Sequence, residues 1–316
     1  MCIKQKPDHS VRLMLEYFHP WPNSAGFYYA RLQGWYEEMG MDLHIELPDP
    51  WHGDSLEHLI RGRVDFAVAP TNRLLVRRER GERLVALAAI NQLELETIQT
   101  LREKNILRPR HLVGRRLAMN PTPRGLAMIR HLVTLDGGNF DDVQIVDAGT
   151  RELRPEDLRA GLADASFGGY WAWETLMDSD VPEEERIVWP VRDIGAPAYH
   201  SYVLCARQEI VEKSPAVTSA FLQVTQKGFT AVASKPLAAL PAYEQATPYL
   251  PSDLLARSLE AIAPSWLHEG TWGTIREPLM QEYTDWLVAH GILSDRQIWR
   301  DVLAPVLHPG SIQELV

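Results

Sequence analysis

The stretch Phe167-Gly168-Gly169-Tyr170-Trp171-Ala172-Trp173-Glu174 decides the fold, because it joins a short apolar run (163–167) to two glycines and a dense aromatic group. This pattern predicts a strand that ends at the glycines, a turn of the backbone, and a helix that begins at Tyr170. Open α/β sheets bind ligands at the carboxyl ends of their strands, where such turns lie. On a helix, Trp171 and Glu174 share one face, and an indole beside a carboxylate suits a planar ligand with N–H donors. The alternative is structural: both tryptophans pack in the core, and Glu174 favours the positive end of its helix.

Length and composition set the first limits. The 316 residues are enough for two domains, each with its own core. A formal charge of −10 argues against a nucleic-acid surface. The two cysteines, Cys2 and Cys205, have no zinc spacing, and we expect neither a metal nor a cofactor.

Membrane and targeting signals bear on where the protein is expected to be located. No stretch of the sequence approaches the roughly 18 apolar residues of a membrane span. Residues 1–10 contain no apolar signal segment. We therefore expect a cytoplasmic protein from this sequence, or an extracytoplasmic one if a signal has been removed.

Hydrophobic periodicity, with glycine and proline as boundaries, predicts alternating strands and helices. We expect strands at 11–18, 41–47, 63–70, 84–90, 94–101, 116–119, 143–147, 163–167, 187–191 and 201–206. We expect helices at 25–39, 55–61, 71–80, 126–135, 154–162, 215–233, 237–246, 252–262 and 275–290. Ser24 and Thr71 are predicted to cap the helices beside them. The strand–helix–strand order predicts an α/β fold with parallel strands, and the helices after residue 206 predict a tail that covers the first lobe.

Two segments far apart in the chain resemble each other. They are Leu-Ile-Arg-Gly-Arg-Val-Asp-Phe-Ala at 59–67 and Leu-Arg-Ala-Gly-Leu-Ala-Asp-Ala-Ser at 158–166. In each, a glycine closes a helix, and an aspartate follows three residues later, just inside a strand. This match predicts two α/β lobes of similar plan.

The order of these motifs resembles the periplasmic-binding-protein family that includes importer receptors for thiamine pyrimidine precursors. The same family contains the fungal enzyme that makes the thiamine pyrimidine. The resemblance spans roughly residues 11–221 and rests on the order and spacing of four short motifs. They are Trp21-Pro22-Asn23, Gly62-Arg63-Val64-Asp65-Phe66-Ala67, Leu112-Val113-Gly114-Arg115-Arg116-Leu117 and the stretch from Gly168 to Glu174.

The resemblance implies an α/β, two-lobe clamp of the type II periplasmic-binding-protein plan, with a ligand cleft between the lobes. Lobe one would hold residues 1–101 and 206–316, with the helical C-terminal tail packed on it, and lobe two would hold residues 102–205. The loops expected at the cleft carry aromatic walls and convergent polar groups, which are typical of a small-molecule pocket. The predicted ligand-binding residues are Trp21, Asn23, Thr71, Asn72, Asn120, Thr122, Trp171, Glu174 and Tyr199.

Several of these residues also fit structural roles. Trp21, between two prolines, suits a packing position, and Asn23 suits the cap of the following helix. Asn120 and Thr122 suit ordinary turn positions between prolines. His200 fits the start of a strand better than a ligand contact.

The enzyme branch of the family resembles a single-turnover synthase that uses pyridoxal phosphate, a lysine, a nearby histidine and a cysteine-rich segment. The matching positions, Val68-Ala69-Pro70-Thr71-Asn72-Arg73, contain neither lysine nor histidine, and only Cys205 stands where the cysteine-rich segment is expected. A Schiff base cannot form without an amine. Glu94 and Glu96 have no recognisable partner in the sequence. These departures favour a protein that is not an enzyme.

We therefore expect a solute-binding protein for a small planar nitrogen heteroaromatic, such as a thiamine pyrimidine precursor, that delivers its ligand to an ABC permease and ATPase. It is expected to be a monomer with no nucleic-acid partner. The alternative is a cytoplasmic enzyme on the same fold, a synthase or decarboxylase acting on a heteroaromatic substrate.

Overall fold

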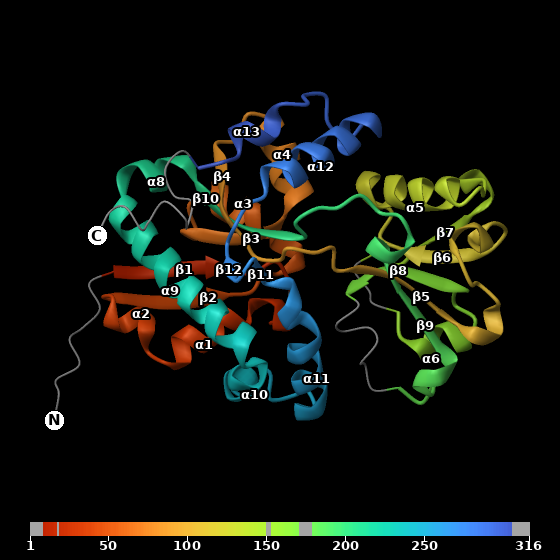
Figure 1. Ribbon diagram of the computed structural model, residues 1–316, viewed down its shortest axis with the longest axis horizontal. Helices are drawn as coiled ribbons and strands as arrows, with labels where there is room; N and C mark the ends of the chain where they lie inside the picture. The colour runs from red at the N-terminus through yellow and green to blue at the C-terminus, as the bar shows by residue number, and fades with distance from the viewer. Residues whose placement is uncertain (1–8, 18, 150–152, 171–178, 305–316) are drawn as a thin grey trace. The chain divides into compact units, whose positions relative to one another are not determined.

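The computed structural model describes residues 9–17, 19–149, 153–170 and 179–304, and the chain divides into two compact units. Unit 1 comprises Met1–Leu93, Tyr199–Val288 and Leu293–Val316, and unit 2 comprises Glu94–Ala198 and Ala289–Ile292. Each unit contains one five-stranded sheet with helices packed against it (Figure 1). The α/β class predicted from the sequence is therefore confirmed.

The sheet of unit 1 has the order β2-β1-β3-β10-β4. Its strands are β1 (His9–Met14), β2 (Met41–Glu46), β3 (Phe66–Pro70), β4 (Leu84–Ala89) and β10 (Tyr202–Arg207). β1 pairs with β2 and β3 in parallel, as the strand–helix–strand order predicted, whereas β10 runs antiparallel to β3 and β4.

The sheet of unit 2 has the order β7-β6-β8-β5-β9. Its strands are β5 (Glu96–Leu101), β6 (Arg116–Met119), β7 (Gln144–Asp147), β8 (Ala165–Tyr170) and β9 (Arg186–Pro190). β5 is the antiparallel member, paired with β8 and β9. β5 is the first strand after the chain enters unit 2, and β10 is the first strand after the chain returns to unit 1. The antiparallel strand thus has the same place in both units, and the two sheets share one topology.

The helices of the described residues are α1 (Ala25–Leu32), α2 (Trp35–Glu38), α3 (Ser55–Ile60), α4 (Thr71–Glu79), α5 (Pro123–Leu135), α6 (Pro155–Arg159), α8 (Gln208–Lys213), α9 (Pro215–Ser234), α10 (Leu240–Ala246), α11 (Ser252–Ile262), α12 (Glu277–Ala289) and α13 (Ile298–Asp301). Most of them overlap a predicted range, but α8 and α13 lie where no helix was predicted. The short strands β11 (Leu267–His268) and β12 (Thr271–Trp272) form a hairpin that the sequence did not indicate. No helix in the described ranges is long and apolar enough to cross a membrane.

The expected single helix at 25–39 is wrong, because the chain breaks at Gly34. This glycine has φ +74°, a left-handed conformation that ends α1 and starts α2. The predicted caps also differ. The Ser24 hydroxyl makes no cap hydrogen bond to α1, and it donates instead to the Trp21 carbonyl oxygen over 2.7 Å. Thr71 is the first residue of α4 rather than its cap.

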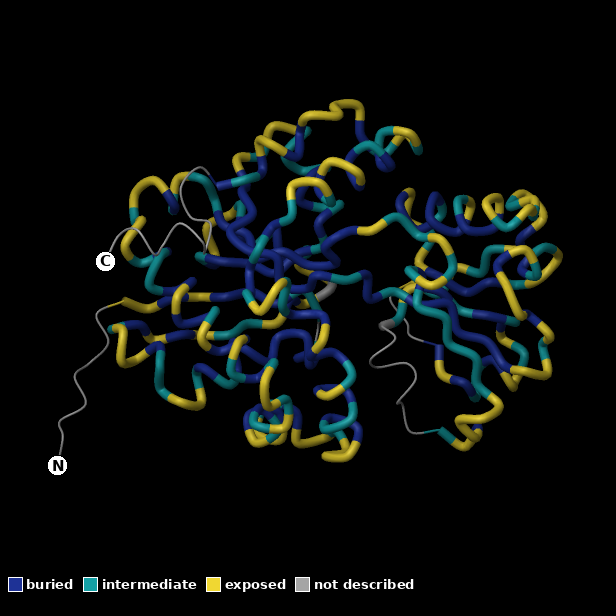
Figure 2. Tube along the Cα trace, in the orientation of Figure 1, coloured by how far each residue is buried: buried dark blue, intermediate teal, exposed yellow. Residues whose placement is uncertain are grey.

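The core of unit 1 lies between its sheet and the helical tail, which packs on this unit as predicted. The rings of Phe66 on β3 and Phe221 on α9 stack with centroids 4.2 Å apart. α9 also runs against α1 at a pair of glycines, where a Cβ on Gly228 would lie 2.3 Å from the carbonyl oxygen of Gly26. Only glycine allows the two backbones to approach this closely. In Figure 2, strands β3, β10 and β4 of this sheet are almost entirely buried.

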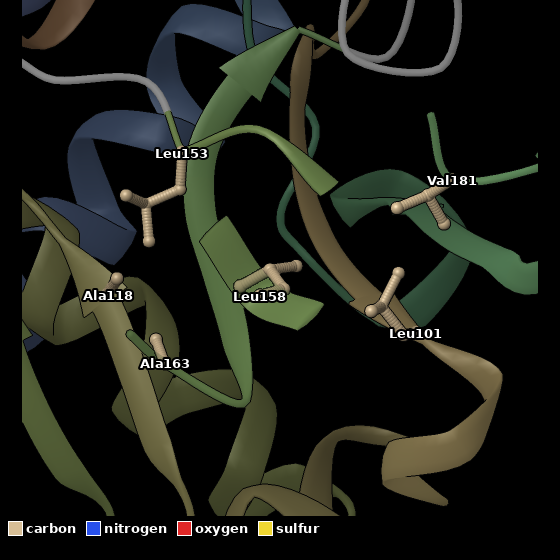
Figure 3. Close-up of a cluster of buried hydrophobic side chains, with 6 residues drawn as sticks. All are labelled: Leu101, Ala118, Leu153, Leu158, Ala163 and Val181. Carbon is tan, nitrogen blue, oxygen red and sulfur yellow. The ribbon is translucent and has the colours of Figure 1, made fainter. Parts of the chain in front are cut away.

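Unit 2 has a core of its own. A cluster of buried apolar side chains gathers on one side of β5, β6 and β8 (Figure 3). Its members are Leu101, Ala118, Leu153, Leu158, Ala163 and Val181. Unit 2 therefore has its own apolar cluster, as expected of a separate folding unit.

The two similar segments of the sequence perform the same structural task in the two units. In unit 1, the Asp65 carboxylate accepts the backbone N–H of Arg12 over 2.8 Å, and Asp65 N–H donates to the Arg12 carbonyl over 2.9 Å. In unit 2, Asp164 and Arg116 make the same two bonds, both over 2.9 Å. Each aspartate thus joins the start of one strand to its parallel neighbour, which explains why the Gly-x-x-Asp pattern occurs twice.

The predicted turn at the two glycines of 168–169 is also wrong. β8 continues through both glycines to Tyr170, which pairs with Glu96 of β5. The register shifts between Glu96 and Ile98, so the glycines form a β-bulge, and Gly168 has φ +117°. The helix predicted after Tyr170 falls on 171–178, outside the described residues.

Candidate functional site

The candidate site of unit 1 lies at the carboxyl edge of its three parallel strands. Met14 at the end of β1 pairs with Glu46 at the end of β2 and with Ala67 of β3. The loops that follow these strands therefore begin side by side. The segment after β1 carries Trp21 and Asn23, and the first turn of α4, directly after β3, carries Thr71 and Asn72.

Trp21 is held in an aromatic group in the loop after β1. Its ring lies 5.1 Å from the ring of Tyr17 in an edge-to-face arrangement and 4.6 Å from the ring of His19. Its carbonyl oxygen accepts hydrogen bonds from the hydroxyls of Ser24 and Tyr243. Trp21 is buried, and burial also lowers the pKa of His19. The indole is therefore fixed in place before any ligand binds.

Two amides at this edge keep their hydrogen-bonding capacity. Asn23 lies in a 3-10 turn (Pro22–Ser24) and Asn72 in the first turn of α4. Among the residues that the structure describes, neither side-chain amide has a hydrogen-bond partner. An amide offers both a donor and an acceptor, so each can serve a ring nitrogen or an amino group of a ligand.

Thr71 and Tyr199 have structural contacts instead. The Thr71 hydroxyl donates to the carbonyl oxygen of His200 over 2.5 Å, and its backbone N–H reaches the carbonyl of Ser201 over 3.4 Å. Tyr199 is buried, and its ring stacks on that of Tyr283 with centroids 4.5 Å apart. These contacts hold residues 199–201, where the chain re-enters unit 1, against the rest of that unit.

His200, beside them, is a buried neutral imidazole. Its Nε2 accepts the backbone N–H of Arg276 over 3.0 Å, so Nδ1 carries the hydrogen and faces the carbonyl oxygen of Asn91 at 3.3 Å. Burial, together with the nearby positive charge of Arg276, lowers the pKa of His200 to about 4. This tautomer follows from the backbone donor at Nε2.

The predicted residues of unit 2 lie between β6 and α5, at the carboxyl edge of β6. Asn120 and Thr122 are exposed. The Thr122 hydroxyl oxygen accepts the backbone N–H of Gly125 over 3.1 Å and caps α5, while its O–H can still donate to a ligand. Trp171 and Glu174 lie outside the described residues.

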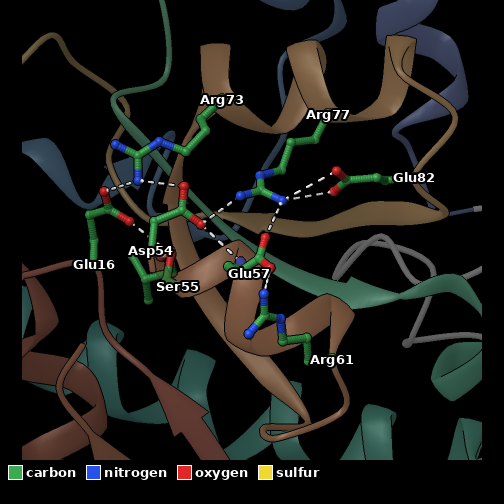
Figure 4. A network of polar contacts seen from close by, with 9 residues as sticks. Glu16, Asp54, Ser55, Glu57, Arg61, Arg73, Arg77 and Glu82 are labelled. Carbon is green, nitrogen blue, oxygen red and sulfur yellow. Dashed lines mark hydrogen bonds and ion pairs between the residues drawn. The ribbon is translucent and has the colours of Figure 1, made fainter. Parts of the chain in front are cut away.

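Sequence reasoning missed a partly buried ion pair at the edge of unit 1. Glu16, two residues after β1, pairs with Arg73 of α4 over 2.5 Å, and the hydroxyl of Ser55 donates to it over 2.8 Å (Figure 4). Burial raises the pKa of the Glu16 carboxyl, although the charge of Arg73 acts in the opposite direction. These residues are 57 positions apart, and no local pattern links them.

A second pair corrects the view that Glu96 has no partner. Arg124, in the first turn of α5, donates to both carboxylate oxygens of Glu96 on β5. Arg124 is buried, and the pair lies where β5 meets the end of β8. The charge of Glu96 is thus neutralised within unit 2.

Comparison with known proteins agrees with this architecture. Residues 21–239 match the family model described as NMT1/THI5 like. The chain is 25% identical over 305 residues to the formylaminopyrimidine-binding protein of Halalkalibacterium halodurans, covering 94% of this chain and 90% of that protein. The ligand-binding component of an ABC-type import system from Staphylococcus aureus superposes with a TM-score of 0.72 at 16% identity, covering 96% of this chain and 99% of that one. The aliphatic sulphonate binding protein SsuA of Escherichia coli gives 0.68 at 17% identity, covering 95% and 98%.

The two mixed sheets and these structural neighbours define the class: the protein has the α/β, two-lobe fold of periplasmic binding proteins. The family follows from the sequence match, which extends over more than half of the chain. The protein belongs to the NMT1/THI5-like family, which confirms the resemblance inferred from its motifs.

Proposed function

We propose that the protein is a solute-binding protein for a small planar nitrogen heteroaromatic, a substituted pyrimidine, and that it delivers this ligand to an ABC permease and its ATPase. The observation that supports the ligand class is the chemistry at the carboxyl edge of unit 1. A fixed indole, Trp21, lies at the same edge as two amides, Asn23 and Asn72, that make no hydrogen bond within the described chain. The relative from Halalkalibacterium halodurans, named for a formylaminopyrimidine, supports the same class.

The remaining predicted contacts stay part of this proposal. Asn120 and Thr122 offer an exposed amide and a hydroxyl, and Trp171 and Glu174 would add a second aromatic wall and an acceptor. Thr71 and Tyr199 would act indirectly, because their side chains contact the backbone and the core. The protein is proposed to work as a monomer, which light scattering on the purified chain would check.

Binding without turnover is the first test. Thermal-shift measurements would be made with aminopyrimidines, purines, flavins and aromatic acids, because a ligand that binds the native state raises the melting temperature. We expect a shift with an aminopyrimidine, and mass spectrometry should recover that compound unchanged. No shift with any aminopyrimidine would refute the proposal, and recovery of an altered compound would favour the enzyme branch.

The second test uses the two amides. Asn72→Ala and Asn23→Ala should each weaken binding by about 0.5–1.5 kcal/mol, the usual contribution of a neutral hydrogen bond. Asn139→Ala is the matched control, because the Asn139 amide is engaged by Asp141 and Asp142 in unit 2. Equal affinities for all three variants and the wild type would remove Asn23 and Asn72 from the site.

A further inference from the structure

Arg73 differs from Arg77, the other arginine that α4 contributes to this network, in how many of its nitrogens are engaged. One terminal nitrogen, Nη1, contacts Glu16 at 2.5 Å and Asp54 at 3.4 Å. Within the described part of the chain, Nε and Nη2 make no hydrogen bond. A guanidinium carries five N–H donors, so the Nε/Nη2 edge remains as an intact fork for a second acceptor. Figure 4 shows the dashed contacts of Arg73 at a single nitrogen.

Arg77, one turn later on α4, provides the contrast. Its Nη2 contacts Asp54 at 3.0 Å, and its Nη1 contacts Glu57 and Glu82 at 3.2 and 3.1 Å. The side chain of Arg77 is 15% exposed, compared with 36% for Arg73. Arg77 therefore acts within the protein, whereas Arg73 presents free donors to the solvent.

The fork of Arg73 is also held in position. Glu16 and Asp54 fix Nη1 from two different elements, and Ser55 at the start of α3 fixes Glu16 in turn. Glu16 follows β1 and Arg73 follows Asn72 in the first turn of α4, so both lie at the edge that carries the candidate site. A rigid fork loses little freedom when it binds an acceptor.

The charge of the network indicates which acceptor fits. It contains four carboxylates (Glu16, Asp54, Glu57 and Glu82) and three guanidinium groups (Arg61, Arg73 and Arg77). The Arg73 charge is thus already compensated, and an anionic ligand group would also face the carboxylates of Glu16 and Asp54. A neutral carbonyl oxygen needs N–H donors but brings no charge, so it avoids this repulsion.

We propose that Arg73 binds a neutral carbonyl oxygen of the ligand, such as that of a formamide or amide substituent on the heteroaromatic ring, through its Nε/Nη2 edge. The inference rests on the proposed function and adds to it the residue that recognises the carbonyl-bearing substituent of the ring. Arg73 would then select ligands that carry this group over those that lack it.

The test compares two matched probes by isothermal titration calorimetry. One is 4-amino-2-methylpyrimidine with a formamidomethyl group at C5, and the other carries a methyl group there and has no acceptor. Arg73→Lys keeps the charge beside Glu16 but removes the planar fork. The wild type should prefer the formamide probe, and the variant should lose about 10- to 100-fold of that preference, as for a hydrogen bond to a charged group. Its affinity for the methyl probe should be unchanged.

Arg77→Lys is the control, and it should leave the ratio of the two affinities as in the wild type. Equal weakening of both probes by Arg73→Lys, or no change in the ratio, would overturn the inference and leave Arg73 as a partner of Glu16 only. Tighter wild-type binding of a C5-carboxylate probe than of the formamide probe would overturn it as well, by showing an anion site. If the wild type binds neither pyrimidine probe, the proposed function itself fails, which is a different result from an unchanged ratio.

Discussion

Acidification should destabilise this protein through His200 in a pH range where most of its carboxylates do not yet titrate. The imidazole is buried, and its Nε2 accepts the backbone N–H of Arg276. Protonation would place a hydrogen on Nε2 against that N–H, beside the positive charge of Arg276. The native state therefore resists the proton, and the pKa of His200 falls to about 4 from its ordinary 6.5.

The sign and size of the effect follow from linkage. The unfolded chain binds the proton below about pH 6.5 and the native protein only near 4, so stability is lost as the pH falls through this window. The full loss is about 3 kcal/mol, at 1.36 kcal/mol per pKa unit, and about 2 kcal/mol of it should have occurred by pH 5.

His200→Gln isolates this contribution. A glutamine amide can donate to the Asn91 carbonyl and accept from the Arg276 N–H, but it does not titrate. Urea unfolding of both proteins would be followed by tryptophan fluorescence at several pH values from 7.5 to 5. The stability of the wild type relative to the variant should fall by about 2 kcal/mol over that range, because other groups cancel in the difference. A difference that does not change with pH would refute the hydrogen-bond arrangement described for His200.

Three further substitutions test the packing and polar contacts of the two units. Gly228→Ala forces a methyl group against the facing carbonyl of α1 and should cost about 1–3 kcal/mol in urea unfolding, whereas Gln223→Ala on the exposed face of α9 should be nearly neutral. Arg124→Met should cost about 1.5–3 kcal/mol by leaving Glu96 without its partner, and adding Glu96→Gln should recover part of that loss. A double variant no more stable than the single one would contradict this. Asp164→Ala should lower the free energy of unfolding by about 1.5–3 kcal/mol and speed hydrogen exchange of the backbone amides in β6 and β8. Unchanged exchange in these strands would show that the aspartate does not join them.

The features that could be predicted from the sequence depend on local periodicity or on a short pattern that occurs in both units. Strands such as Arg116–Met119 and helices such as Ser252–Ile262 were predicted with their observed bounds, because apolar spacing and flanking turn residues agree there. The Gly-x-x-Asp match predicted two similar lobes, and the structure supplies the reason in the bonds of Asp65 and Asp164. A signal that occurs twice is informative even when each occurrence is weak.

Glycine caused both main errors of local structure. At Gly34 a positive φ ends a helix in the middle of an apolar pattern that continues, so periodicity alone could not locate the break. At the glycines 168–169 the same freedom produces a bulge within a strand, where the sequence indicated a turn. At 168–169, a turn and a bulge differ in whether the neighbouring strand β5 continues to pair beyond the glycines. That pairing is a tertiary fact with no local signature.

The candidate site shows a related limit. Residue type identified groups that can bind a heteroaromatic ligand, but it could not tell which of them the protein itself uses. Thr71 and Asn72 are adjacent in the sequence, yet the hydroxyl of one is bonded to the His200 carbonyl and the amide of the other has no partner among the described residues. Arg73, the next residue, uses one nitrogen for Glu16 and keeps a fork free. A ligand can use only donors and acceptors that the fold has not already engaged. Long-range contacts such as these therefore decide, more than residue type does, which side chains at this edge can recognise a ligand.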